Sequence, residues 1–66
     1  METKYPEIKV KLTGEDGNAF SILGRVTRAM RNASVSKEER DAFHAEATSG
    51  DYDHLLATAM RWVDVS

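Results

Sequence analysis

The chain has 66 residues, no cysteine, and a formal net charge of −2 from 9 basic and 11 acidic side chains. The lack of cysteine excludes disulfides and a thiolate metal site, and a chain this short buries only about 60% of the surface that it exposes when unfolded. The charge balance argues against a general duplex-binding protein, which needs a basic excess to displace counterions. A partner chain or a second copy is therefore the expected source of additional stability.

The first predicted element is a strand over residues 7–12. Its apolar residues Ile8, Val10 and Leu12 alternate with charged residues, which is the period-two pattern of a half-buried strand. Pro6 stands just before this strand, where its missing amide hydrogen does no damage. Turn-forming residues follow the strand and end it.

A helix is predicted over residues 19–32, with Asn18 as its N-terminal cap. Its apolar residues recur at helical spacing and form one stripe suited to face a core. They are Ala19, Ile22, Leu23, Val26, Ala29, Met30 and Ala33. The opposite side of the helix carries a basic stripe of Arg25, Arg28 and Arg31.

A second helix is predicted over residues 37–48, and it begins at a Ser-Lys-Glu-Glu capping box that starts with Ser36. Gly50 is suited to the left-handed conformation that commonly ends a helix. The apolar face of this helix is thin, since it consists mainly of Phe43 and Ala47. We therefore expect it to be the least anchored element.

A third helix is predicted over residues 52–61, with Asp51 as its cap. Its apolar residues follow the helical pattern closely: Tyr52, Leu55, Leu56, Ala59, Met60 and Val63. Residues 62–65 have the β-branched and aromatic bias of a short strand, although they also fit the frayed end of the helix. We favour the strand, because it can pair with residues 8–12.

These elements predict a single α+β domain with the order β-α-α-α-β, in which three helices pack on a small two-stranded antiparallel sheet. Such a sheet leaves both outer edges unpaired. We therefore expect the protein either to pair edges in a homodimer or to offer an edge to a partner.

Catalytic and metal-binding patterns are weak in this sequence. His44 and His54 are the only neutral nitrogen ligands, and they lie on different predicted helices without i, i+4 spacing, so we expect solvated histidines and no metal. Residues 49–54 gather a hydroxyl, two carboxylates and an imidazole, but so close to a helix start they favour capping. We expect no cofactor and no enzymatic activity, because so small a domain has little room for a pocket that excludes water.

The candidate contact residues are polar or aromatic. The basic stripe is the best polar candidate and can bind carboxylates or phosphates, although we favour a solvated helix face as its explanation. Trp62 is either an interface anchor or a cap on the core. The acidic candidates are Glu15 and Asp16 in the turn after the first strand, and Glu38, Glu39 and Asp41 on the second helix.

The segments LTGEDGNAF (residues 12–20) and SGDYDHLL (residues 49–56) resemble a group of very short proteins of phages and bacterial mobile elements, whose motifs carry no assigned chemistry. Proteins of this size and type are similar in build to anti-CRISPR and other anti-defence inhibitors. The resemblance implies an inhibitor that occupies a surface of a host complex. We expect a cytoplasmic protein, in the host cell if it is phage-encoded, because the N-terminus lacks the apolar stretch of a signal peptide and no segment is long enough for a membrane helix.

Two functions are therefore predicted. The first is a non-enzymatic protein-binding module, plausibly an inhibitor of a bacterial defence complex. The alternative is a nucleic-acid or nucleotide binder that uses Arg25, Arg28 and Arg31.

Overall fold

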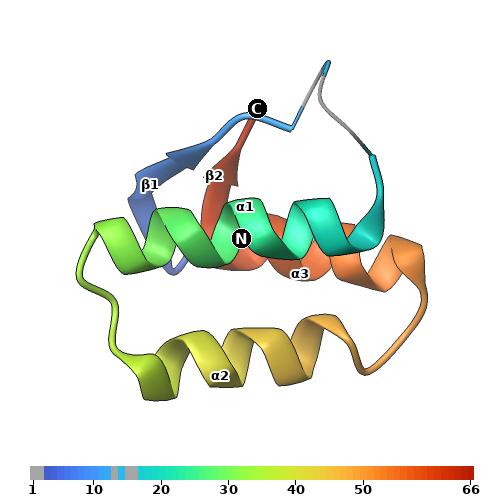
Figure 1. Cartoon of the computed structure of the whole chain (residues 1–66). Helices are drawn as coiled ribbons and strands as arrows, with labels where there is room; N and C mark the ends of the chain where they lie inside the picture. Colours follow the sequence, from blue (N-terminus) through green and yellow to red (C-terminus); the bar gives the residue numbers. More distant parts are fainter. Residues whose placement is uncertain (1–2, 13, 15–16) are drawn as a thin grey trace.

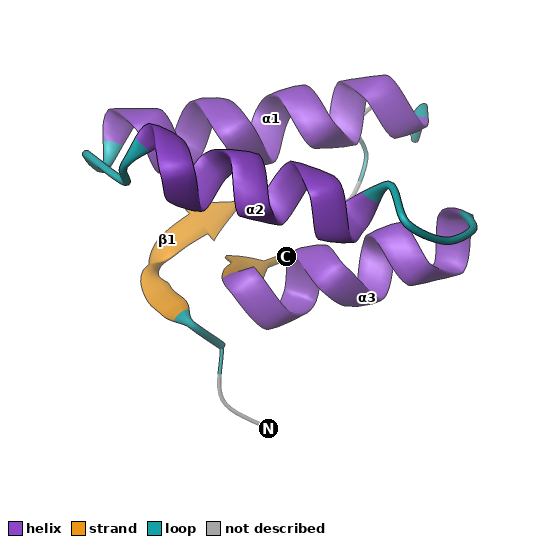
Figure 2. Ribbon diagram, turned by 90° about the horizontal axis from the view of Figure 1, so that it is seen from below, coloured by secondary structure: helices purple, strands orange, loops and turns teal. Residues whose placement is uncertain are grey.

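The computed structural model describes residues 3–12, 14 and 17–66. Its elements are β1 (Tyr5–Val10), α1 (Ala19–Asn32), α2 (Lys37–Ala47), α3 (Tyr52–Trp62) and β2 (Val63–Val65). Figure 1 shows the two strands on one side of α1 and α3, with α2 on the other side, and Figure 2 shows the three helices next to one another. The order β-α-α-α-β agrees with the prediction, and α1 has the predicted bounds.

The two strands pair in parallel, so the predicted antiparallel sheet is wrong. The reason lies in the number of helices between the strands. Figure 1 shows that α1, α2 and α3 run in alternating directions, so that three passes return the chain to the end at which β1 began. A strand that starts there runs in the same direction as β1, as in any unit in which a helical crossover joins two parallel strands.

The pairing of β1 with β2 is irregular near its start. Tyr5 is opposite Val63 and Lys9 is opposite Asp64, so β1 contains extra residues between two neighbouring pairs. Pro6 lies inside this irregular part of β1, although we predicted it before the strand. Proline is tolerated at such an irregularity, because it lacks an N–H and no strand-pairing hydrogen bond is required from that residue.

The core lies on both sides of α1 and α3, against the sheet on one side and against α2 on the other. Its buried apolar residues are Ile8, Val10, Ile22, Leu23, Val26, Met30, Phe43, Ala47, Leu55, Ala59, Trp62 and Val63. Phe43 is fully buried, and its ring makes a T-shaped contact with the Trp62 ring, with 5.7 Å between the ring centroids. The thin apolar face of α2 is therefore anchored by one aromatic contact to the end of α3.

Two carboxylates of α2 add polar anchors to this contact. Glu39 accepts a hydrogen bond from the Tyr5 hydroxyl at 2.8 Å and pairs with Lys4 at 2.5 Å. Glu46 pairs with Arg61 and accepts a hydrogen bond from the Trp62 indole at 3.2 Å. These contacts join residues far apart in the sequence, so the pattern of α2 alone did not predict them. Because of them, α2 is better anchored than its apolar residues indicate.

The ends of α1 and α2 differ from what the glycine pattern predicts. After α1, Ser34 has a positive φ of 66°, and its N–H donates to the Arg31 carbonyl while the Val35 N–H donates to the Met30 carbonyl. This is the two-bond arrangement that usually places glycine at the left-handed position. Gly50 has no positive φ; a Cβ there would lie 2.8 Å from Cγ of His54, so this glycine provides space for the imidazole.

We predict that Ser34→Gly stabilises the protein by about 0.5 to 1 kcal/mol. The substitution removes the cost of a side chain in the left-handed region, and this gain exceeds the loss from the greater entropy of glycine in the unfolded chain. Urea unfolding of the two proteins measures the difference. Ser34→Ala is the matched control and should not stabilise. Equal or lower stability of Ser34→Gly would show that this turn is not strained.

Candidate partner-binding groove

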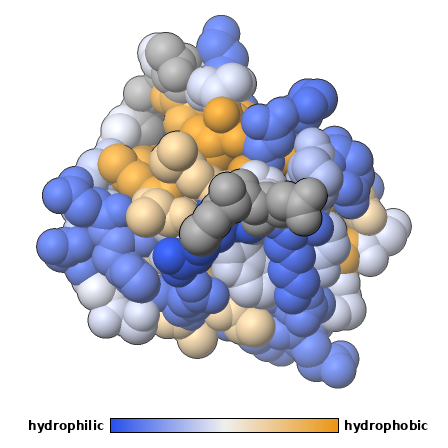
Figure 3. All heavy atoms as spheres, turned by 180° about the vertical axis from the view of Figure 1, so that it is seen from behind, coloured by the Kyte–Doolittle hydropathy of each residue, from blue (hydrophilic) through white to orange (hydrophobic). Residues whose placement is uncertain are grey.

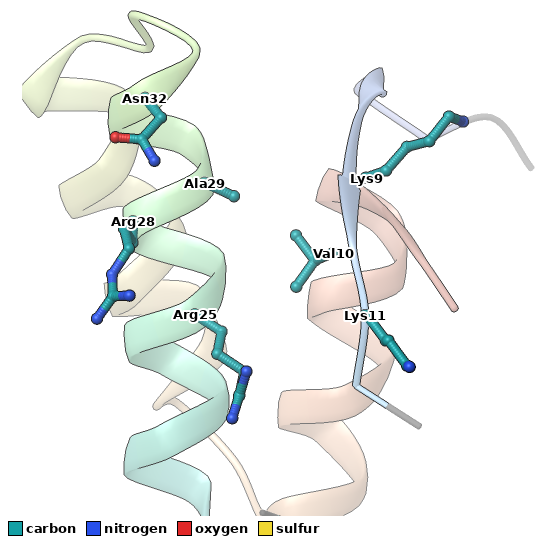
Figure 4. Close-up of a pocket in the computed structure, with 7 residues that line it drawn as sticks. All are labelled: Lys9, Val10, Lys11, Arg25, Arg28, Ala29 and Asn32. Carbon is teal, nitrogen blue, oxygen red and sulfur yellow. The ribbon is translucent and has the colours of Figure 1, made fainter. Parts of the chain in front are cut away.

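A groove with basic walls runs between β1 and α1, and we call it the basic groove. It has a volume of about 260 Å³ and is lined by Lys9, Val10, Lys11, Arg25, Arg28, Ala29 and Asn32. Figure 4 shows Val10 pointing from β1 toward α1, whereas Lys9 and Lys11 point away from α1. A second hollow of about 340 Å³ shares Lys9, Ala29 and Asn32 with it and extends toward Glu7. The groove therefore follows β1 along residues 7–11.

In the described part of the chain β1 pairs with β2 alone, so its other backbone edge is unpaired and lies beside this groove. The Val10 carbonyl accepts from the Ser66 N–H at 3.0 Å, and the Leu12 N–H donates to the Ser66 carbonyl at 2.8 Å. Backbone groups of successive strand residues point to opposite edges. Since those of Val10 and Leu12 point toward the C-terminal strand, those of Lys9 and Lys11 point away from it, to the free edge.

Of the four cations that line the groove, Lys9 and Arg25 have interaction partners, whereas Lys11 and Arg28 have no carboxylate partner among the described residues. Lys37 lies 2.9 Å from Asp41, and Lys9, on the outer face of the sheet, lies 2.7 Å from Asp64. By contrast, within the described part of the chain no carboxylate lies within ion-pair distance of Lys11 or Arg28, and both side chains are exposed. A guanidinium and an ammonium in this setting can bind carboxylate or phosphate oxygens.

The structure divides the predicted basic stripe. Arg25 and Arg28 line the groove, whereas Arg31 is exposed on α1 and lines none of the hollows beside β1. Lys9 and Lys11 replace it as groove residues, and our sequence analysis did not identify them as contact residues. The sequence did contain a signal for these two residues: Lys9 and Lys11 directly precede and follow Val10, a strand residue expected to face the core.

The acidic candidates are dispersed. Glu15 and Asp16 lie outside the described residues. Glu38 is exposed in the first turn of α2, and Asp41 pairs with Lys37 on the same helix. Glu39 faces the N-terminal segment and holds it against α2 through Lys4 and Tyr5.

Trp62 is 7% exposed and leaves little surface for a partner. Its ring packs against Tyr5 and Phe43 with centroid distances of 6.2 Å and 5.7 Å, and the Lys4 ammonium lies 4.5 Å from the Trp62 ring centre. Of the two readings of Trp62, these contacts favour the cap on the core.

The contacts of Glu39 and Glu46 make stability depend on acid pH. Hydrogen bonds from Lys4 and Tyr5 lower the pKa of Glu39, and those from Arg61 and Trp62 lower the pKa of Glu46. Because both pKa values are lower in the folded protein, the stabilisation is complete above about pH 4.3, the ordinary glutamate value, and is lost as the pH falls toward the folded pKa values.

We therefore predict that the urea midpoint changes little between about pH 7 and 5 and falls below about pH 4.5. The variant with Glu39→Gln and Glu46→Gln should be less stable near neutral pH and show a smaller fall. Glu38→Gln, on the exposed side of α2, is the matched control. An equal acid-induced fall in the double variant would contradict the assigned role of the two carboxylates.

The serine and histidine of the SGDYDH segment are in contact, but not as nucleophile and base. His54 Nε2 lies 2.9 Å from the Glu46 carbonyl and 3.1 Å from the Ser49 hydroxyl, which itself donates to the same carbonyl at 2.7 Å. A carbonyl oxygen only accepts, so Nε2 carries the hydrogen and cannot take a proton from Ser49. The contacts join the end of α2 to the start of α3, so His54 is partly buried and only His44 is solvated as predicted.

Asp51 has the predicted capping role, because its carboxylate accepts from the His54 N–H at 2.9 Å. Within residues 3–12, 14 and 17–66, no three histidine, aspartate or glutamate side chains gather in a way that could hold a metal ion. In the same part of the chain, no helix has both the length and the apolar character needed to cross a membrane.

A second surface is apolar. It is a hollow of about 260 Å³ between the starts of α1 and α3 and the end of α2, beside Phe20, which is 83% exposed, and Tyr52, which is 44% exposed. Asp51 is the charged side chain in its lining. Figure 3 shows that apolar side chains also gather in one area of the face seen from behind, with hydrophilic side chains around it.

No protein-family model matches the chain, and no curated protein or solved structure is significantly similar to it.

Proposed function

We propose that this chain is a small non-enzymatic protein-binding module and that the basic groove is its contact surface. The observation that carries the proposal is that Lys11 and Arg28, two exposed cations without a carboxylate partner among the described residues, both line the groove beside the free edge of β1. The edge offers directed hydrogen bonds, and the cations offer charge complementarity.

The floor of the groove supports the same function. Val10 is buried and Ala29 is half-buried, and both lie between the charged walls. An apolar floor surrounded by polar groups is the usual composition of a protein interface, in which the centre excludes water and the rim provides specificity. The resemblance to short phage proteins gives this module a biological setting: an inhibitor of the anti-CRISPR type that occupies a surface of a bacterial defence complex in the host cytoplasm.

A homodimer through the β1 edge fits the charges poorly. Pairing two β1 edges would bring Lys9, Lys11 and Arg28 of both copies into one interface, where, among the residues that the structure describes, each copy adds a single lining carboxylate, that of Glu7. Like charges that meet across an interface are destabilising. The charges of the groove therefore favour an acidic partner over a second copy.

The proposal is tested by partner capture from a bacterial lysate with the wild-type chain, Arg28→Glu and Arg31→Glu as baits. The two variants change the net charge equally on the same helix, but only Arg28 lines the groove. We expect a partner that wild type and Arg31→Glu retain and that Arg28→Glu loses at least about tenfold, which corresponds to about 1.4 kcal/mol. Equal recovery by all three baits would contradict the assignment of the groove.

The second candidate is a nucleic-acid binder. The observation that favours it is that Arg25, Arg28 and Lys11 line the same groove, and such cations also bind phosphates. This function predicts that a fluorescent single-stranded oligonucleotide binds with an affinity that falls steeply with salt and is weakened by Arg28→Glu. Unchanged anisotropy at low salt would eliminate it.

A further inference from the structure

We infer, on the basis of the proposed function, that the occupant of the basic groove is an extended acidic segment of a partner protein, which joins β1 as a third strand. The groove runs beside consecutive residues 7–11 and not along one face of the strand. Side chains of consecutive residues point to opposite faces, so a ligand that meets all of them lies at the edge. An extended chain is the ligand that uses such an edge fully, because its own backbone completes the ladder.

The backbone of β1 determines where the segment would be held. The N–H and carbonyl groups of Lys9 and Lys11 point to the free edge, because those of Val10 and Leu12 point to the C-terminal strand. Residues 7–11 correspond to about 16 Å of strand. A segment of about five residues would therefore occupy the groove and complete the hydrogen bonds of the two lysines.

The side chains of β1 and α1 determine the chemistry of the segment. Alternate side chains of an added strand would point toward α1, where Val10 and Ala29 form the floor, Arg25 points into the space between α1 and β1, and Arg28 lines the groove farther out on α1. The others would lie on the outer face, beside Lys9 and Lys11. Lys9 already pairs with Asp64 and Arg25 has an interaction of its own, so Lys11 on the outer face and Arg28 on α1 are the cations that favour carboxylates in the segment and disfavour lysine or arginine.

The occupant can be tested with the immobilised full chain and a display library of random twelve-residue peptides. Selections on the wild-type chain are compared with selections on Arg28→Glu and on the matched control Arg31→Glu. We expect enrichment of peptides rich in aspartate and glutamate on wild type and Arg31→Glu, and at least about tenfold weaker binding to Arg28→Glu. Amide hydrogen exchange by NMR should then show new protection at Lys9 and Lys11 when an enriched peptide is bound.

Each other outcome has a distinct meaning. Enriched peptides that depend on Arg28 but leave the exchange of Lys9 and Lys11 unchanged would keep the groove as a protein-binding site and overturn strand addition. Enrichment of peptides without acidic bias would overturn the assigned chemistry. If no peptide distinguishes wild type from Arg28→Glu, or if a twelve-nucleotide single strand binds the groove more tightly than every peptide, the proposed function itself falls.

Discussion

Phe43→Ala should unfold most of the protein at 25 °C. Phe43 is fully buried and is the one large apolar side chain that α2 contributes to the core. Truncating a buried phenylalanine to alanine costs about 3 to 5 kcal/mol. A core of this size supplies on the order of 3 to 5 kcal/mol in total, so the loss is comparable to the whole stability. Far-UV circular dichroism and the fluorescence of Trp62 measure the folded fraction.

Phe20→Ala is the matched control for this prediction. The same residue type is 83% exposed at the start of α1, so its truncation should change the free energy of unfolding by no more than about 0.5 kcal/mol. A Phe43→Ala variant with near wild-type stability would contradict the assigned position of α2.

Trp62→Ala should destabilise the fold by a similar amount, about 3 to 5 kcal/mol. It removes the ring that packs between Tyr5 and Phe43 and the indole N–H that donates to Glu46. The loss therefore separates α2 and the N-terminal segment from the end of α3 at once. Because Trp62 is the single tryptophan of the chain, circular dichroism in urea is the suitable measurement.

Trp62→Phe separates packing from hydrogen bonding, since it keeps an aromatic ring and removes the indole N–H. We expect a smaller loss, about 1 to 2 kcal/mol, and an intact fold at 25 °C. The structural role of Trp62 would be wrong if Trp62→Ala folded normally and instead lost its partner, because that is the behaviour of an exposed interface anchor.

The helices could be predicted from the sequence because their signals are local. Asn18, Ser36 and Asp51 accept hydrogen bonds from the N–H groups of Phe20, Glu39 and His54, as their positions before apolar-periodic segments indicate. Caps and periodicity depend on residues a few positions apart, so no tertiary contact is needed to locate them. The helix end at Ser34 was not predicted, because a serine in the left-handed region has no clear sequence signal.

The strand direction could have been derived from the sequence by counting helices. Helices joined by short connections alternate in direction, so three of them bring the chain back to the start of β1, and this conclusion needs only the element order and the loop lengths. By contrast, the irregular register around Pro6 depends on where α3 delivers the chain to Val63. The place where α3 ends beside β1 is determined by helix packing, and the residue pattern of a single strand gives no information about that packing.

The candidate site was predicted in part. The stripe on α1 identified Arg25 and Arg28, because helical spacing places them on one side. It could not show that β1 lies beside these two and not beside Arg31, since that depends on the crossing of strand and helix. For the same reason Glu39 was grouped with the exposed acids of α2, although it faces Lys4 and Tyr5.

The central claim is that the basic groove is the surface that meets the partner. Hydrogen exchange of the free chain and of the captured complex, followed by mass spectrometry, tests it most directly. We predict that partner binding slows exchange in residues 7–11 and 25–32, which line the groove. Slower exchange confined to the exposed side of α2, or to the segments around Phe20 and Tyr52, would contradict the claim.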